Sequence, residues 1–178
     1  MAAKTAKMID AETPEIVETN TTTSKSKLNV KKKIPLDELV YVKNLTGGKL
    51  IYHSRSINGY YVEWQEYGEE VPIEMRELIN MKNTDRIFFT ENWIEVDIAV
   101  LRDLKMDMYY KDSITFDEIE SIKNDDVEKI IKKIKKAKPI IKNSIGIRVM
   151  KMIEDGELTN VNTIKKLEEA IGCELFER

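Results

Sequence analysis

The sequence predicts an α+β protein with a small antiparallel, partly barrel-like sheet and one short helix, followed by a C-terminal bundle of about four helices. Between residues 36 and 97, apolar and polar residues alternate and are interrupted by glycine-containing turn signals, which is typical of paired β-strands. After residue 112, apolar residues recur at helical spacing between capping residues. We therefore divide the chain into a flexible basic arm (1–35), a β-rich domain (36–97), a connector (98–112) and a helical domain (113–178).

Two turn signals organise the predicted sheet. The pair Gly47-Gly48 predicts a hairpin between strands at about 39–45 and 49–54, because glycine adopts positive φ at little cost. The pair Asn58-Gly59 predicts a second tight turn, which leads into the aromatic-rich strand 60–67. We expect these three strands to form a meander.

The region after the meander predicts one helix and two further strands. Pro72 is well placed near a helix start, and the apolar spacing within 73–82 predicts a short amphipathic helix against the sheet. Residues 86–96 contain two apolar, strand-like runs around a turn at Glu91-Asn92. These strands would complete a strongly bent sheet or partial barrel.

The helical domain has clear start and stop signals. Thr115 and Glu118 fit a capping box, and Asp125 is expected to begin a second helix. Pro139 ends or kinks that helix, and Gly172 provides a left-handed cap for the last one. The apolar stripe of the second helix consists of Val127, Ile130, Ile131 and Ile134.

Charge is uneven along the chain. The first 33 residues carry seven lysines and four acids, whereas the whole chain of 178 residues has a net charge of −3. The arm lacks aromatic residues, so we expect it to be disordered alone in water. Its basic cluster of Lys31, Lys32 and Lys33 belongs either to a solvated tail or to a tether that becomes ordered on a partner.

Composition argues against several function classes. Cys173 and His53 are the only residues of their types, so a disulfide within the chain and a Cys/His zinc site are excluded. No apolar run is long enough to span a bilayer. His53 lacks a partner at telling spacing for a catalytic triad, and Thr46-Gly47-Gly48-Lys49 lacks the flanking residues of a phosphate loop. We expect no enzymatic activity and no cofactor.

Two sets of residues are candidates for partner binding. Tyr60 and Trp64 lie in the aromatic strand, where neighbouring glutamates favour core or protein contacts over stacking on nucleic acid. Lys132, Lys133 and Lys136 lie opposite the apolar stripe of the second helix. That basic face is either solvated, or docks on an acidic protein surface, or binds phosphate in nucleic acid.

Two resemblances bear on function. The segment TIKKLEEAIGCEL, residues 163–175, resembles the last helix of repressor-type helix-turn-helix domains. Three longer segments, VYVKNLTGGKLIYHS, VPIEMRELINM and FFTENWIEV, together with the lysine-rich helical region, resemble small virion-associated structural or accessory proteins of tailed bacteriophages from low-GC hosts. This second resemblance carries no catalytic motif.

The phage resemblance implies a structural or assembly protein of a capsid, head-tail connector or tail. Such a protein would be made in the host cytoplasm and located in the virion, where it would bind other virion structural proteins, in a larger symmetric assembly and away from membranes. A flexible arm and two small folded domains are compatible with binding several neighbours. The alternative is a nucleic-acid-binding regulator that uses the lysine-rich helix and the C-terminal bundle.

Overall fold

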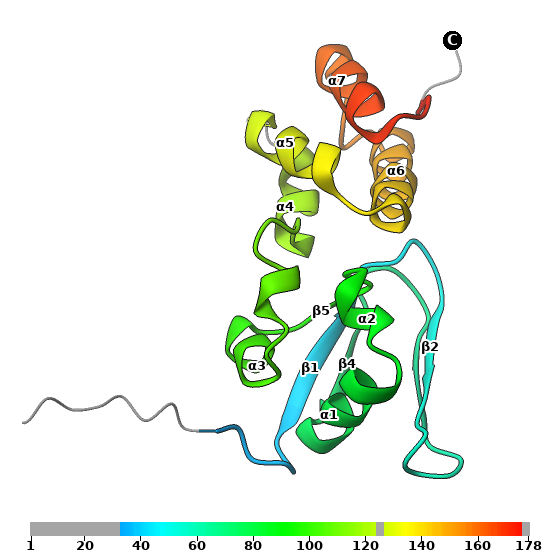
Figure 1. The fold of residues 1–178 in the computed structure, drawn as a ribbon. Coiled ribbons are helices and arrows are strands. Elements are labelled where there is room, and N and C mark those ends of the chain that lie inside the picture. The colour runs from blue at the N-terminus through cyan, green and yellow to red at the C-terminus, as the bar shows by residue number, and fades with distance from the viewer. Residues whose placement is uncertain (1–32, 124–126, 176–178) are drawn as a thin grey trace, which may run out of the picture. The chain divides into compact units, whose positions relative to one another are not determined.

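The computed structural model describes residues 33–123 and 127–175. Its strands lie in the first part of the chain and form small antiparallel sheets, and several helices follow (Figure 1). The predicted α+β class is therefore confirmed. Of the predicted arm, only residues 33–35 are described, so Lys31 and Lys32 lie outside the described residues. None of the described helices is both long and apolar enough to cross a membrane.

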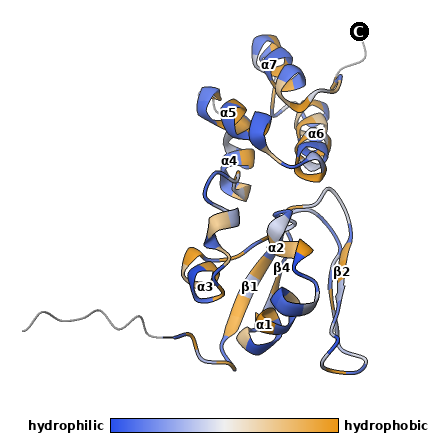
Figure 2. Cartoon of the chain, in the orientation of Figure 1, coloured by the Kyte–Doolittle hydropathy of each residue, from blue (hydrophilic) through white to orange (hydrophobic). Residues whose placement is uncertain are grey.

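Strand β1 (Leu39–Asn44) is the centre of a three-stranded sheet. It pairs antiparallel with β4 (Glu70–Glu74) on one side and with the two-residue β5 (Ile94–Glu95) on the other, in the order β4-β1-β5. Val40 and Val42 are buried on one face of β1. The strand is coloured hydrophobic along most of its length (Figure 2), because its other face also carries apolar side chains.

The second sheet is a hairpin of β2 (Leu50–His53) and β3 (Tyr61–Trp64). The predicted turn before β3 is confirmed: Gly59 has a φ of +79°, and the Tyr60 amide donates to the carbonyl of Ile57 at 3.2 Å. The predicted three-strand meander is wrong, because β1 pairs with β4 and β5 and does not pair with β2. The described strands therefore form no closed barrel.

The side chain of Asn44 explains why the Gly47-Gly48 segment makes no hairpin. Its Nδ2 donates to the carbonyls of Gly48 and Glu66 at 2.8 and 3.0 Å, and its Oδ1 accepts from the backbone and hydroxyl of Thr46. Neither Gly47 nor Gly48 has positive φ. The side-chain amide of Asn44 thus closes this turn. In the predicted hairpin, backbone hydrogen bonds between the two strands would have closed it instead.

Two predictions about the segment after β3 are corrected. Pro72 lies inside β4, and helix α1 (Met75–Thr84) begins three residues later. The first of the two predicted strands in residues 86–96 is instead the helix α2 (Ile87–Thr90), and only β5 remains of the second. Phe88 and Phe89 are adjacent and both buried, which a helical turn permits and strand alternation does not.

The C-terminal half follows its predicted signals closely. After α3 (Ile98–Asp103) and a 3₁₀ turn at Asp107–Tyr109 come α4 (Phe116–Glu120), α5 (Glu128–Lys136), α6 (Pro139–Glu154) and α7 (Val161–Ile171). The capping box at Thr115 is present, Pro139 opens α6, and Gly172 has a φ of +87°. The predicted stripe of α5 is buried. Asp125 lies outside the described residues.

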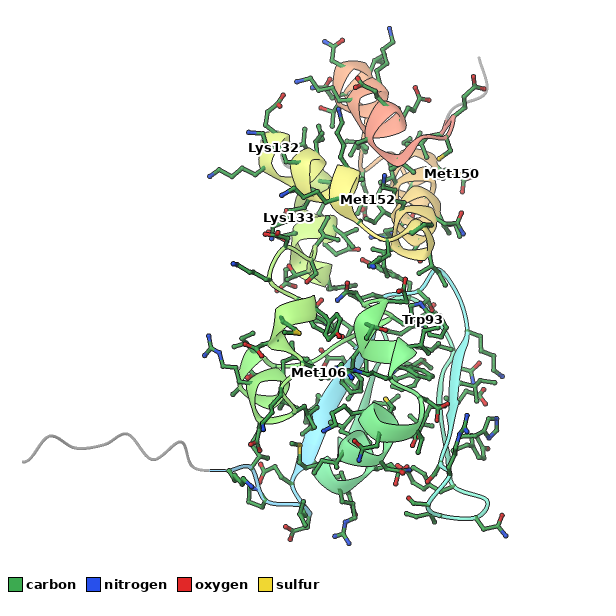
Figure 3. The ribbon with its side chains drawn as sticks, in the orientation of Figure 1. Trp93, Met106, Lys132, Lys133, Met150 and Met152 are labelled. Carbon is green, nitrogen blue, oxygen red and sulfur yellow. The ribbon has the colours of Figure 1, made fainter. Side chains whose placement is uncertain are left out.

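Two apolar clusters hold these elements together. The first lies under the sheets and includes Trp64, whose Nε1 donates to the carbonyl of Val42 at 2.8 Å. The second joins α4 to α7 and also contains Leu45, the residue that follows β1. Figure 3 shows Trp93 and Met106 on the sheet-bearing half and Met152 among the later helices.

Gly68 lies where these two halves meet. Its φ is +81°, and a Cβ added there would lie 2.5 Å from Cε2 of Phe116 at the start of α4. Phe116 also packs against Tyr67, with ring centroids 5.2 Å apart. Space and backbone conformation both require glycine at position 68.

We predict that Gly68→Ala lowers the free energy of unfolding by about 2–4 kcal/mol, because it combines a strained backbone with a steric clash. The matched control is Gly48→Ala, since Gly48 has no positive φ and no atom lies within 4 Å of an added Cβ. That control should change stability by less than about 1 kcal/mol. Equal losses in urea denaturation would contradict this account of the junction.

Candidate interaction surface

One face of the three-stranded sheet is uncovered over much of its area. We call it the open sheet face and define it by three cross-strand pairs of outward-facing residues: Leu39 with Glu74, Tyr41 with Pro72, and Lys43 with Glu70. Leu39 and Tyr41 remain 57% and 65% exposed although they lie in the central strand. A soluble sheet usually places polar residues on such a face. The exposed apolar side chains at these positions make the open sheet face a candidate contact surface.

A row of charges closes the face at the carboxyl end of β1. Lys43 lies in β1, where it pairs with Glu70 of β4 on one side and with Glu95 of β5 on the other. Its Nζ lies 3.0 Å from Glu70 Oε1 and 4.2 Å from the centroid of the Phe116 ring. The Phe116 amide donates to Glu95 Oε2 at 2.7 Å. The start of α4 is thereby fixed against this end of the sheet.

An open pocket of about 390 Å³ lies beside this charge row. Three carboxylates and one lysine line it, so its charged groups are net negative. Apolar atoms of Tyr41, Ile98 and Leu101 form other parts of its wall. Such a pocket fits an apolar stem that ends in a cationic group. Its charged residues are Lys43, Glu70, Glu95 and Asp97.

Burial raises the pKa of Glu95 above its ordinary value, although the Phe116 amide and Lys43 act in the opposite direction. Burial likewise raises the pKa of Tyr110, whose hydroxyl donates to the carbonyl of Ile94 at 2.7 Å. Only Oε2 of Glu95 accepts a hydrogen bond from the described residues. Its other oxygen is an available acceptor in the pocket wall.

The lysine-rich face of α5 is largely compensated by nearby acids. Lys133 Nζ contacts both carboxylate oxygens of Glu118 at 2.6 and 2.8 Å. Lys136 lies 4.0 Å from Asp112, whereas Lys132 is exposed (Figure 3). These pairs reduce the positive potential that a phosphate backbone would meet.

The remaining predicted residues do not form one site. Lys33 is exposed, and Tyr60 is half-buried against the first apolar cluster. Trp64 is fully buried, so placing it at a partner surface is corrected: it shares the inward face of β3 with Val62. His53 is exposed on β2 against the ring of Tyr61 and does not line the pocket beside Glu95.

A second carboxylate, on α1, is buried in a hydrogen-bond network. Glu77 is only 3% exposed and accepts hydrogen bonds from Tyr52, Asn80 and Ser56 at 2.7 to 3.4 Å. Burial raises the pKa of Glu77, but these hydrogen bonds and one from Ser54 outweigh it and hold the pKa below its usual value. This network ties α1 to β2 around a buried carboxylate.

Sequence reasoning missed the residues that the structure brings together here. Tyr41, Lys43 and Glu95 come from two strands whose pairing no local turn specifies. The available signal was the segment Leu39–Asn44, which is apolar on both faces and therefore predicts a covered strand. Within the described ranges, no group of three or more His, Cys, Asp or Glu side chains could hold a metal ion.

We predict that Glu95→Gln becomes increasingly favourable as the pH rises. A raised folded-state pKa contributes stability at pH values below the ordinary glutamate pKa, and this contribution is lost as the pH rises through the folded-state value. Glutamine keeps an acceptor for the Phe116 amide but does not ionise. Between about pH 4 and pH 7, the unfolding free energy of Glu95→Gln should therefore increase relative to that of wild type.

The matched control in the same urea titrations is Glu66→Gln, because Glu66 is exposed whereas Glu95 is partly buried. A difference for Glu95→Gln that decreases as the pH rises would contradict burial as the dominant influence on this carboxyl group.

No family of known proteins, no curated protein and no solved structure matches this chain.

Proposed function

We propose that this chain is a non-enzymatic assembly protein that binds neighbouring subunits in the virion of a tailed bacteriophage. The observation that carries the proposal is the open sheet face, on which Leu39 and Tyr41 are exposed while Val40 and Val42 anchor the same strand in the core. Ordered apolar side chains on a rigid strand are preorganised for contact with another protein.

The basic arm supports the same function. In the sequence, Lys31, Lys32 and Lys33 form a basic cluster shortly before β1, which would serve as a second binding element. Two linked contacts bind more tightly than either alone, because the first raises the effective concentration of the second. The virion setting rests on the sequence resemblance, and the contact function rests on the exposed face.

Nucleic-acid binding is a second candidate function, favoured by the basic face of α5. Lys129 and Lys132 are exposed on this helix. However, Lys133 and Lys135 contact Glu118 and Glu169, so phosphate would have to compete with carboxylates. The compensation of these charges favours the assembly function.

For the assembly function we predict that the chain co-sediments in fixed stoichiometry with a much larger particle from infected cells. Tyr41→Asp should reduce its occupancy at least about tenfold, because a buried unpaired carboxylate in a contact is costly. Tyr61→Asp is the matched control, since Tyr61 is also a strand tyrosine and is 57% exposed, but on the other sheet. Absence of the chain from every particle fraction would refute the proposal.

For the alternative we predict weak binding to unrelated DNA duplexes, with dissociation constants above about 1 μM at physiological salt. Fluorescence anisotropy across a salt series measures this directly. Sub-micromolar binding that falls steeply with salt and is lost in the double variant Lys129→Glu/Lys132→Glu would favour the nucleic-acid function instead.

A further inference from the structure

We infer that the free edge of β1 accepts an extended segment of a partner protein as an added strand, with a lysine or arginine of that segment in the pocket beside Glu95. This inference rests on the proposed assembly function and specifies the chemistry of the partner. Three features of the sheet support it. The backbone groups of Leu39 and Tyr41 face away from β4, the two edges of the sheet are protected differently, and acidic residues lie at the end of the free edge.

The register determines which backbone groups of β1 face β4. The backbone amide of Asn44 donates to the backbone carbonyl of Glu69 at 3.0 Å. The backbone carbonyl of Glu38 accepts from the backbone amide of Met75 at 2.9 Å. Both pairs continue the β1–β4 register. In an antiparallel pair, backbone groups alternate between the two edges. The even-numbered residues of β1 therefore direct their backbone groups toward β4.

The odd-numbered residues direct theirs toward the opposite edge. There, Leu45 donates to the carbonyl of Trp93 at 2.9 Å, and Lys43 pairs with Glu95. Strand β5 ends at Glu95, and α3 follows from Ile98. The backbone groups of Leu39 and Tyr41 thus face no partner strand within the described part of the chain.

The two edges of the sheet differ in how they are protected. On the outer edge of β4, Pro72 removes a donor and lies between the acidic residues Glu70 and Glu74. Proline and charge are the usual means of preventing strand addition. The edge of β1 at Leu39 and Tyr41 contains neither a proline nor a charged residue, although acidic residues line the pocket beside it. It also presents the exposed side chains of Leu39 and Tyr41 on the outer face.

The end of this edge is suited to a cationic side chain. A strand added beside Leu39 and Tyr41 would lie near the pocket, because Tyr41, Glu95 and Asp97 all line it. Lys43 is already engaged by Glu70 and the Phe116 ring. Glu95 keeps one oxygen without a donor from the described residues. A lysine or arginine on the outer face of the added strand would supply that donor, and backbone pairing would supply the register.

The test uses full-length protein and two synthetic peptides, acetyl-Thr-Val-Lys-Val-Thr-amide and the same peptide with glutamate at its centre. In an added strand, both valines face inward and the central residue faces the pocket side. Residue-resolved NMR should show fast hydrogen exchange at Leu39 and Tyr41 in the unliganded chain. Saturating lysine peptide should slow exchange at both residues and leave Val40 and Val42 unchanged, because they are already paired with β4.

The lysine peptide should bind at least about fivefold more tightly than the glutamate peptide, and Glu95→Gln should remove most of this difference. Leu39→Pro should abolish binding because it removes an edge donor at the first residue of the strand, where proline is tolerated. Leu39→Ala shortens the same side chain but keeps the backbone donor, so it should bind more weakly than wild type and more tightly than Leu39→Pro. Circular dichroism verifies that each variant is folded.

Three results would each overturn the inference: slow exchange at Leu39 and Tyr41 in the unliganded chain, equal or absent binding of the two peptides, or equal binding by Leu39→Pro and Leu39→Ala. The proposed function fails separately. If Tyr41→Asp is lost from particles while neither peptide binds, the assembly function stands and the added strand is wrong. If the peptides bind as expected but no particle contains the chain, the assembly function is wrong.

Discussion

The buried side-chain amide of Asn44 is the interaction on which the rest of the structure depends. It ends β1, closes the turn at Gly48 and binds the carbonyl of Glu66, which follows β3. The next residue, Leu45, belongs to the second apolar cluster. A hydrophobic side chain at position 44 would leave the buried backbone amide of Thr46 without its acceptor and the carbonyls of Gly48 and Glu66 without their donor, which is costly. Asn44, at the end of β1, therefore holds the two sheets together and positions Leu45, which belongs to the second apolar cluster.

This arrangement explains which parts of the fold the sequence could predict. Helix boundaries depend on neighbouring residues, so Thr115, Pro139 and Gly172 correctly identified the start of α4, the end of α5 and the end of α7. Strand pairing depends on distant residues, and nothing near β1 indicates that its partner is β4. Local turn preference at Gly47-Gly48 favoured a hairpin, whereas the polar side chain at Asn44 decided the outcome.

The candidate surface shows the same limit. Aromatic content selected Tyr60 and Trp64, but residue type does not distinguish the two faces of a strand. Alternation does: Tyr61 and Glu63 face outward on β3, so Trp64 must share the inward face with Val62. The same reasoning applied to β1 places Tyr41 outward. Lysine content selected α5, but the acids that compensate it come from other helices and from the connector.

The difference between the two edges of the three-stranded sheet supports a binding function more strongly than the exposed side chains of Leu39 and Tyr41 do. An unprotected strand edge promotes aggregation, and soluble proteins usually block it. Here the outer edge of β4 is blocked by Pro72 between two glutamates, while the edge of β1 beside a net negative pocket is left unblocked. A chain that evolved only for solubility would gain from protecting both edges. Protection of one edge alone is expected when the other is covered in the assembled state, and the carboxylates beside it then favour a basic partner over indiscriminate strand addition.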